Sequence, residues 1–120
     1  MTGFIKSVRY ALDGLFSALK TERNLRIHIV ALFIAVALGL YLKLSIMRWG
    51  IIILVIGFVL VAELFNTAIE RLCDETANGQ QKKLIKKAKD VAAAGVLLSA
   101  ITALIIGVLF LLIPFIQTFR

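Results

Sequence analysis

The chain has 120 residues, 61% of them hydrophobic, and a mean hydropathy of +0.98. A soluble domain is about 45–50% apolar, so this composition excludes an ordinary soluble fold and predicts a small integral membrane protein. The net charge is +7, but the cations form short clusters beside apolar segments, which indicates membrane topology and argues against nucleic-acid binding. One short bundle buries little surface, so we expect subunits to associate.

Residues 4–20 have the pattern of an amphipathic helix. Apolar residues from Phe4 to Leu19 recur at spacings of three and four, and charged residues from Lys6 to Lys20 occupy the remaining face. Because charges interrupt every apolar stretch, this helix is expected to lie on a membrane surface rather than to cross the bilayer.

The apolar segments that follow are long enough to cross a bilayer. We expect spanning helices over residues 25–42, 49–74 and 91–117. A turn over residues 44–49 separates the first two spans, and a cytoplasmic loop over 75–90 precedes the last. The sequence therefore predicts a single all-α membrane domain, made of a surface helix and three transmembrane helices, with no separate soluble domain.

Small residues recur at every fourth position in the first and third spans. They are Ala31, Ala35 and Gly39 in the first, and Gly95, Ser99, Ala103 and Gly107 in the third. Stripes of this kind let a neighbouring helix approach closely, so these faces are expected to contact other helices.

Lys and Arg are distributed unequally between the two sides of the predicted spans. They are frequent around the start of the first span and in the loop over 75–90, whereas the opposite side has only Lys43 and Arg48 between the first two spans and Arg120 at the tail. By the positive-inside rule, the N-terminus and this loop face the cytoplasm and the C-terminus lies outside.

The most informative stretch is the end of the second span. Its polar residues Glu63, Asn66, Glu70 and Asp74 fall within an arc of roughly 80° on one helix face, and we call these four residues the acidic face. A carboxylate near the bilayer centre costs about 2.5–3.5 kcal/mol, which argues that the acids have a use. The pattern predicts a cation and phosphate site at a membrane surface.

The depth of each residue indicates its role. Glu63 would lie deepest, where a lipid hydroxyl resides, and is the candidate general base. Glu70, with Glu22 from the start of the first span, could hold Mg²⁺ through carboxylate oxygens and waters. Asn66 offers an amide donor and acceptor between them.

Further candidates lie outside the acidic face. Lys89 suits a phosphate group as a point charge, and Asp90 could hold that lysine or bind a ribose or a metal-bound water. Arg26 is a candidate contact for a lipid headgroup. Metal, cation, base and positioning groups are what phosphoryl transfer requires, although the sequence carries no P-loop and no protein-kinase signature.

Other interpretations stay open at this point. Glu63 could pair with a cation on a neighbouring helix and serve assembly alone, and Asp74 could be a solvated helix-end acid. His28 is interpreted as an interfacial filler rather than a catalytic group. A holin-like pore or a cation carrier is the alternative function, but the third span offers only Ser99 and Thr102 as polar groups between Val91 and Ile116.

The motif E-x-x-N-T-A-I-E-x-x-x-D over residues 63–74, followed by K-A-K-D-V-A-A over 87–93, resembles the small integral-membrane bacterial diacylglycerol kinase family. The leader E-R-N-x-R-I-H over 22–28 is more similar to its undecaprenol kinase branch. The resemblance covers nearly the whole chain. One departure lies in the loop, where the family often has a Glu-Tyr-His-like stretch and residues 78–82 read N-G-Q-Q-K, so no nucleotide contact is carried over there.

The resemblance implies an ATP-dependent kinase that phosphorylates the hydroxyl of a membrane lipid, with undecaprenol favoured over diacylglycerol as the acceptor. It implies a homotrimer in the bacterial cell membrane with active sites shared between subunits. ATP and Mg²⁺ would enter from the cytoplasm, and the lipid would enter from the bilayer.

The resemblance also implies roles for individual residues. Glu63 becomes the catalytic base that meets the lipid hydroxyl, and Glu22 and Glu70 hold the metal on ATP. The nucleotide contacts that it implies are Tyr10, Glu22, Asn66, Glu70, Lys89 and Asp90.

Overall fold

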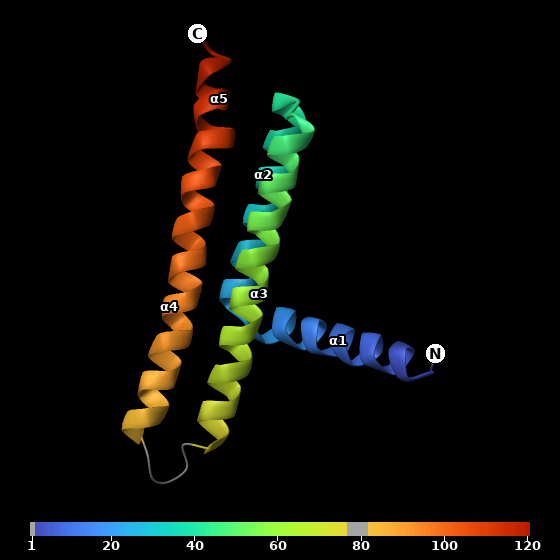
Figure 1. Ribbon diagram of the computed structural model, residues 1–120, viewed down its shortest axis with the longest axis vertical. Helices are drawn as coiled ribbons and strands as arrows, with labels where there is room; N and C mark the ends of the chain where they lie inside the picture. The colour runs from blue at the N-terminus through green and yellow to red at the C-terminus, as the bar shows by residue number, and fades with distance from the viewer. Residues whose placement is uncertain (1, 77–81) are drawn as a thin grey trace.

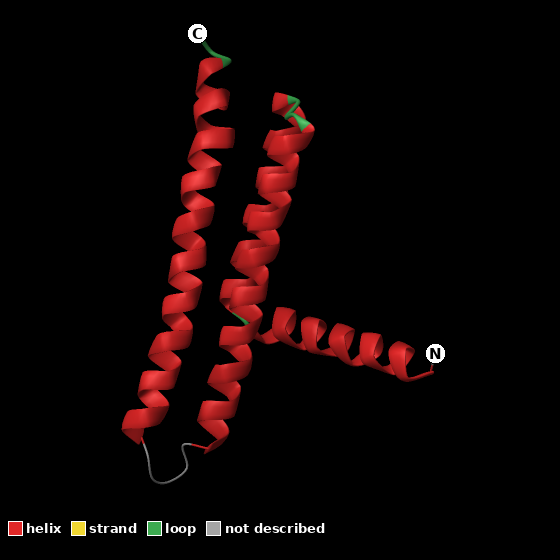
Figure 2. Cartoon of the chain, viewed as in Figure 1, coloured by secondary structure: helices red, strands yellow, loops and turns green. Residues whose placement is uncertain are grey.

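The computed structural model describes residues 2–76 and 82–120, and within these ranges the chain forms helices and short connections without a strand (Figure 2). The helices are α1 (Thr2–Thr21), α2 (Arg23–Leu42), α3 (Ile46–Thr76), α4 (Lys82–Gly107), the π-helix η1 (Val108–Leu112) and α5 (Ile113–Gln117). The expected break at Asn78 and Gly79 lies outside the described residues.

The helices α2, α3 and α4 run side by side, and η1 and α5 continue α4 in the same direction (Figure 1). The first helix, α1, leaves this bundle at a steep angle, and α4 packs mainly against α3. Helices long and apolar enough to cross a membrane cover Arg23–Leu42, Ile46–Thr76 and Lys82–Gln117. The all-α class and the three candidate spans are therefore confirmed.

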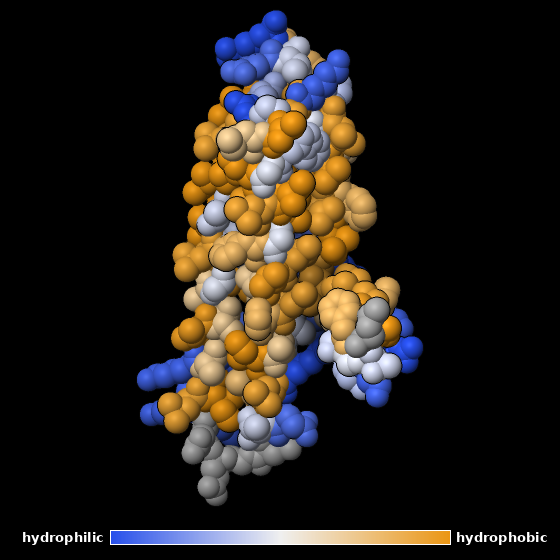
Figure 3. All heavy atoms as spheres, turned by 45° about the vertical axis from the view of Figure 1, so that its right-hand side comes forward, coloured by the Kyte–Doolittle hydropathy of each residue, from blue (hydrophilic) through white to orange (hydrophobic). Residues whose placement is uncertain are grey.

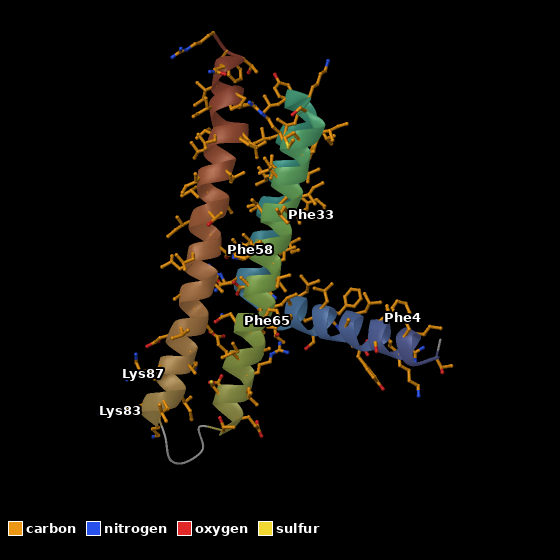
Figure 4. All side chains as sticks on the ribbon, viewed as in Figure 1. Phe4, Phe33, Phe58, Phe65, Lys83 and Lys87 are labelled. Atoms are coloured by element: carbon orange, nitrogen blue, oxygen red, sulfur yellow. The ribbon has the colours of Figure 1, made fainter. Side chains whose placement is uncertain are left out.

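The surface of the bundle has a broad apolar band between two hydrophilic ends (Figure 3). Large apolar side chains face outward within this band, among them Phe33 and Phe58, which are 66% and 56% exposed (Figure 4). Lys83 and Lys87 extend from the end of α4 that follows the loop (Figure 4). An apolar belt between charged ends is what a bilayer-spanning bundle requires.

The connection between α2 and α3 is shorter than the sequence predicts. Lys43 adopts a left-handed conformation with φ of 53°, which ends α2, and α3 begins at Ile46 rather than near Trp49. The earlier start follows from Ser45, whose Oγ accepts a hydrogen bond of 3.3 Å from the backbone N–H of Arg48 and so caps the helix.

The small residues of α2 serve two different purposes. A Cβ on Gly39 would lie 2.6 Å from the Trp49 ring, so glycine at this position is what lets the tryptophan pack against the helix. Ala35 and Ala31, one and two turns closer to the start of α2, instead line a cavity. The close helix contact expected for the small residues of α2 therefore occurs at Gly39, near the end of the helix.

The third span departs from a regular α-helix near its end. The π-helical turn η1 ends two residues before Pro114, which lacks an N–H and whose ring would clash with the carbonyl four residues earlier. The wider π-helical turn accommodates this proline, so that α4, η1 and α5 form one continuous helical segment. Nearby, the Phe115 ring meets Tyr41 edge to face at 6.1 Å, and the Arg48 guanidinium lies 5.1 Å from the Phe110 ring centroid.

Candidate active site

The acidic face runs from the buried interior of the bundle to its surface along α3. Glu63 is 1% exposed and Asn66 is 7% exposed, whereas Glu70 is half-buried. The Asp74 side chain, near the end of α3, is 67% exposed. The exposure of the polar side chains on this helix face thus increases from Glu63 to Asp74, because successive turns of α3 emerge from the packed bundle.

The deepest acid has a partner on the neighbouring helix. Nε2 of His28, in the second turn of α2, lies 3.6 Å from Oε2 of Glu63. The Glu63 side chain is 2% exposed and that of His28 is 23% exposed. His28, interpreted from the sequence as an interfacial filler, therefore has its ring beside the buried acid.

Buried polar atoms without a hydrogen-bond partner cluster around this acid. Among the described residues they are Glu63 Oε2, Asn66 Oδ1 and Thr67 Oγ1. Leaving a polar group buried and unpaired costs about 1–3 kcal/mol, and more when it is charged. Thr67 was not singled out from the sequence, although its position four residues after Glu63 places it on the same helix face.

The second turn of the acidic face is connected to the junction of α1 and α2. Nδ2 of Asn66 donates to Oε1 of Glu70 at 3.4 Å, which orients that carboxylate. Glu22 is the extended residue between α1 and α2, and its Oε1 lies 3.8 Å from Nη2 of Arg71. The sequence offered no role for Arg71 beyond its charge, and the structure reveals it as a link between α3 and this junction.

Arg71 also holds the end of α1. Its guanidinium donates to Ser17 Oγ at 3.4 Å and to Thr21 Oγ1. The same side chain therefore contacts both the end of α1 and Glu22. The position of the Glu22 carboxylate depends on this contact.

The carboxylates present suit Mg²⁺ in the type of ligand that they offer. Within residues 2–76 and 82–120, no group of three His, Cys, Asp or Glu side chains forms a closed metal cage. Mg²⁺ does not require one, because it is usually held by one or two carboxylates together with substrate phosphates and waters. Glu22 and Glu70 could supply such a pair.

The basic residues at the start of α4 pair with acids. Nζ of Lys89 donates to Oδ1 of Asp74 at 2.8 Å, and Nζ of Lys86 donates to Oδ2 of Asp90 at 2.8 Å. The expectation that Asp90 holds Lys89 is therefore wrong. Adjacent helical residues point in different directions, whereas residues four apart share a face.

Two other candidates lie away from the acidic face. Nη1 of Arg26 donates to the carbonyl oxygens of Leu19 and Lys20, at 3.0 and 2.9 Å, and so caps the end of α1. Tyr10 lies in the middle of α1 and is 68% exposed. The structure therefore does not bring Tyr10 to the acidic face of its own subunit.

An apolar cavity of about 290 Å³ lies between α2, α3 and α4. It includes small residues from α2 and α4, such as Ala35 and Ala103, and larger aliphatic residues from α3. His28 is its one polar lining residue and lies at the end nearest Glu63. His28 thus contacts the buried Glu63 carboxylate and also lines the apolar cavity.

The chain is similar to known membrane kinases. A family model described as prokaryotic diacylglycerol kinase matches residues 9–111. The undecaprenol kinase of Bacillus subtilis is 39% identical over 109 residues, which cover 91% of this chain and 88% of that protein. A diacylglycerol kinase of Synechocystis is 39% identical over 90% of this chain and 62% of that protein. A diacylglycerol kinase of Escherichia coli K12 is 32% identical over 87% of each.

Proposed function

The chain belongs to the prokaryotic diacylglycerol kinase family and is a membrane-embedded lipid kinase, and we propose that undecaprenol is its acceptor and Glu63 its general base. The family resemblance inferred from the motifs is confirmed by the family match and by the named relatives. The observation that carries the assignment of the base is the burial of Glu63, which is 1% exposed beside an apolar cavity.

The proposed reaction is a direct transfer between ATP and a lipid alcohol. The Glu63 carboxylate takes the proton of the lipid hydroxyl, and the hydroxyl oxygen forms a bond to the γ-phosphorus. The bond from the γ-phosphorus to the β,γ-bridging oxygen breaks, and ADP leaves with that oxygen. Positioning and charge stabilisation account for most of the catalysis of such a transfer.

In this proposal the metal ion acts on the phosphates of ATP rather than on the lipid. Glu22 and Glu70 would hold Mg²⁺, which when bound neutralises phosphate charge and orients the γ-phosphate. Asn66 would keep the Glu70 carboxylate in place through its 3.4 Å hydrogen bond. Arg71 would keep Glu22 near α3 by its contact of 3.8 Å.

Lys89 is the proposed phosphate contact at the mouth of the site. Its present partner Asp74 is largely exposed, and exposed ion pairs contribute only about 0–1 kcal/mol, so the lysine could exchange this carboxylate for a phosphate at little cost. Asp90 and Tyr10 are proposed as further nucleotide contacts, and Arg26 as a headgroup contact.

The choice of undecaprenol rests on similarity and on one chemical point. The relative from Bacillus subtilis is named an undecaprenol kinase, and the match covers 88% of that protein compared with 62% of the equally identical diacylglycerol kinase of Synechocystis. Both acceptors present one hydroxyl at the same depth. The wholly apolar lining beyond His28 suits a hydrocarbon chain without ester groups.

We further propose a homotrimer in which α1 lies on the cytoplasmic membrane surface. The homotrimer is what the resemblance to the family implies. Support for the position of α1 comes from the angle at which it leaves the bundle (Figure 1), and Lys83 and Lys87 lie at the start of α4 (Figure 4), where the apolar band ends (Figure 3). By the positive-inside rule this end faces the cytoplasm of a bacterial cell, and ATP is available there. The C-terminus would then lie outside.

The pore and carrier alternatives are disfavoured by the family membership. They are also disfavoured by the polar residues within α4. Ser99 Oγ donates to the carbonyl of Val96 at 2.7 Å, and Thr102 Oγ1 donates to the carbonyl of Leu98 at 2.9 Å. Both hydroxyl groups are satisfied by their own helix, so neither offers a step in a polar path across the bilayer.

The experiment that tests the acceptor is transfer of radiolabelled γ-phosphate by purified protein in mixed micelles. Undecaprenol and diacylglycerol are supplied in parallel at equal mole fraction, with ATP and Mg²⁺. We expect label in the organic phase predominantly with undecaprenol. Predominant labelling of diacylglycerol would overturn the acceptor assignment, and no label with either lipid from folded protein would overturn the proposed reaction.

A further inference from the structure

His28 occupies a position that the proposed reaction does not yet use. Its Nε2 lies 3.6 Å from Oε2 of Glu63, and within the described residues no Lys or Arg nitrogen lies within 4.0 Å of this carboxylate. Oε2 is buried and has no hydrogen-bond partner in that part of the chain. The imidazole is therefore the group best placed to decide how the Glu63 carboxylate is oriented.

The same imidazole is part of the wall of the apolar cavity. All the other described residues that line the cavity are aliphatic or glycine, and they come from α2, α3, α4 and η1. His28 thus stands between the space that suits a hydrocarbon chain and the carboxylate that meets a hydroxyl. A lipid whose chain occupies the cavity would bring its polar end past His28 to Glu63.

We propose that His28 is a positioning residue of the lipid kinase: its Nε2–H is directed at Oε2 of Glu63 and fixes the carboxylate, so that the other oxygen, Oε1, meets the lipid hydroxyl. The inference deepens the proposed function and rests on Glu63 as the base. The distance of 3.6 Å is longer than a hydrogen bond, and catalytic hydrogen bonds commonly tighten when the substrate binds.

A carboxylate without this contact would be free to rotate. Misplacing a reacting group by about 1 Å costs on the order of 100-fold in rate, so loss of the contact is expected to lower kcat. Binding of ATP involves other residues and is expected to be unchanged. A packing role would have the opposite signature, with lower stability of the protein and unchanged kcat for the molecules that remain folded.

The test compares three substitutions at this position. His28→Gln places an amide N–H near the position of Nε2, His28→Asn places one near Nδ1 and falls short of Glu63, and His28→Leu removes the donor. Each purified variant is assayed with undecaprenol and, in parallel, with diacylglycerol, and kcat and KM for ATP and lipid are measured. Thermal unfolding is followed as a check of stability.

We expect His28→Leu and His28→Asn to lower kcat on the order of 10-fold to 100-fold with KM for ATP unchanged, and His28→Gln to restore most of the loss. Equal kcat for Leu, Asn and wild type would overturn the inference, and so would equally low values for Gln and Leu in folded proteins. Because Leu fills about the same space as His and Gln, its failure together with rescue by Gln cannot arise from lost packing volume alone.

A parallel assay of Glu63→Gln separates the two claims. If Glu63→Gln is inactive while His28→Leu is fully active, the base is retained and the positioning role is wrong. If Glu63→Gln keeps wild-type turnover, the proposed base is wrong, and the positioning role is lost with it.

Discussion

At the end of the bundle where α2 turns into α3, small and aromatic side chains pack closely, whereas on the acidic face near the other end buried polar atoms lack partners. At the turn, Gly39 admits the Trp49 ring, and Phe115 stacks edge to face with Tyr41. On α3, Glu63 and Asn66 each leave a buried oxygen without a hydrogen bond among the described residues.

The difference separates what holds the subunit together from what performs its chemistry. Close packing contributes dispersion and apolar burial, so the turn is expected to stabilise the bundle. An unpaired buried polar group costs free energy, and such groups are retained where they meet a ligand or a substrate. Substitutions at the two ends should therefore change different measured quantities.

The largest effect is expected for Glu63→Gln. The substitution keeps the size of the side chain and removes its ability to accept the proton, and a general base contributes about 10²–10⁴-fold to a rate. Steady-state transfer of labelled phosphate to undecaprenol should fall by that factor, with thermal stability unchanged or raised. Glu75→Gln, at an exposed acid on the same helix, is the matched control and should retain wild-type turnover.

A smaller loss is expected for Glu70→Gln, which removes a proposed metal ligand. The Mg²⁺ concentration for half-maximal activity should rise on the order of 10-fold to 100-fold, and excess Mg²⁺ should restore part of the rate. A titration of activity against Mg²⁺ at saturating ATP measures this shift. An unchanged midpoint would exclude Glu70 from the metal site.

At the turn, Gly39→Ala should affect stability alone. The new Cβ would lie 2.6 Å from the Trp49 ring, and overpacking of this kind costs about 1–3 kcal/mol. Gly95→Ala is the matched control, because a Cβ there meets nothing within 4 Å. Thermal unfolding in detergent should be lowered for the first variant only, while kcat per folded molecule stays at the wild-type value for both.

The smallest effect is expected for Asp74→Asn, which breaks the contact with Lys89. The pair is exposed, so the free energy of unfolding should change by at most about 1 kcal/mol, and by less at high salt. A drop several times larger in chemical unfolding would show that the pair stabilises the packing of α4 on α3 more than its exposure indicates.

Much of the fold could be predicted because apolar length and charge distribution are local properties of the sequence. The three candidate spans and the all-α class follow from them. The start of α3 at Ile46 was missed because the single serine cap at Ser45 outweighs the apolar pattern that begins at Trp49. The π-helical turn before Pro114 was missed because it depends on whether the helix continues beyond the proline, as it does in α5.

The candidate site was predictable to the extent that it lies on one helix. The spacing of Glu63, Asn66 and Glu70 places them on a common face, and two of the three are buried. The contact between His28 and Glu63 depends on the register of α2 against α3, which no local pattern reveals. In the same way, the pairing of Lys89 with Asp74 arises only when α4 packs on α3.

The most direct test of the account is a single-turnover measurement with Glu63→Gln and Glu75→Gln beside the wild type. Enzyme in excess is loaded with undecaprenol and labelled ATP, Mg²⁺ is added, and the rate at which label enters the organic phase is followed. The account predicts a rate at least about 100-fold slower for Glu63→Gln, with normal ATP binding, and a wild-type rate for Glu75→Gln. Equal rates in all three proteins would contradict it.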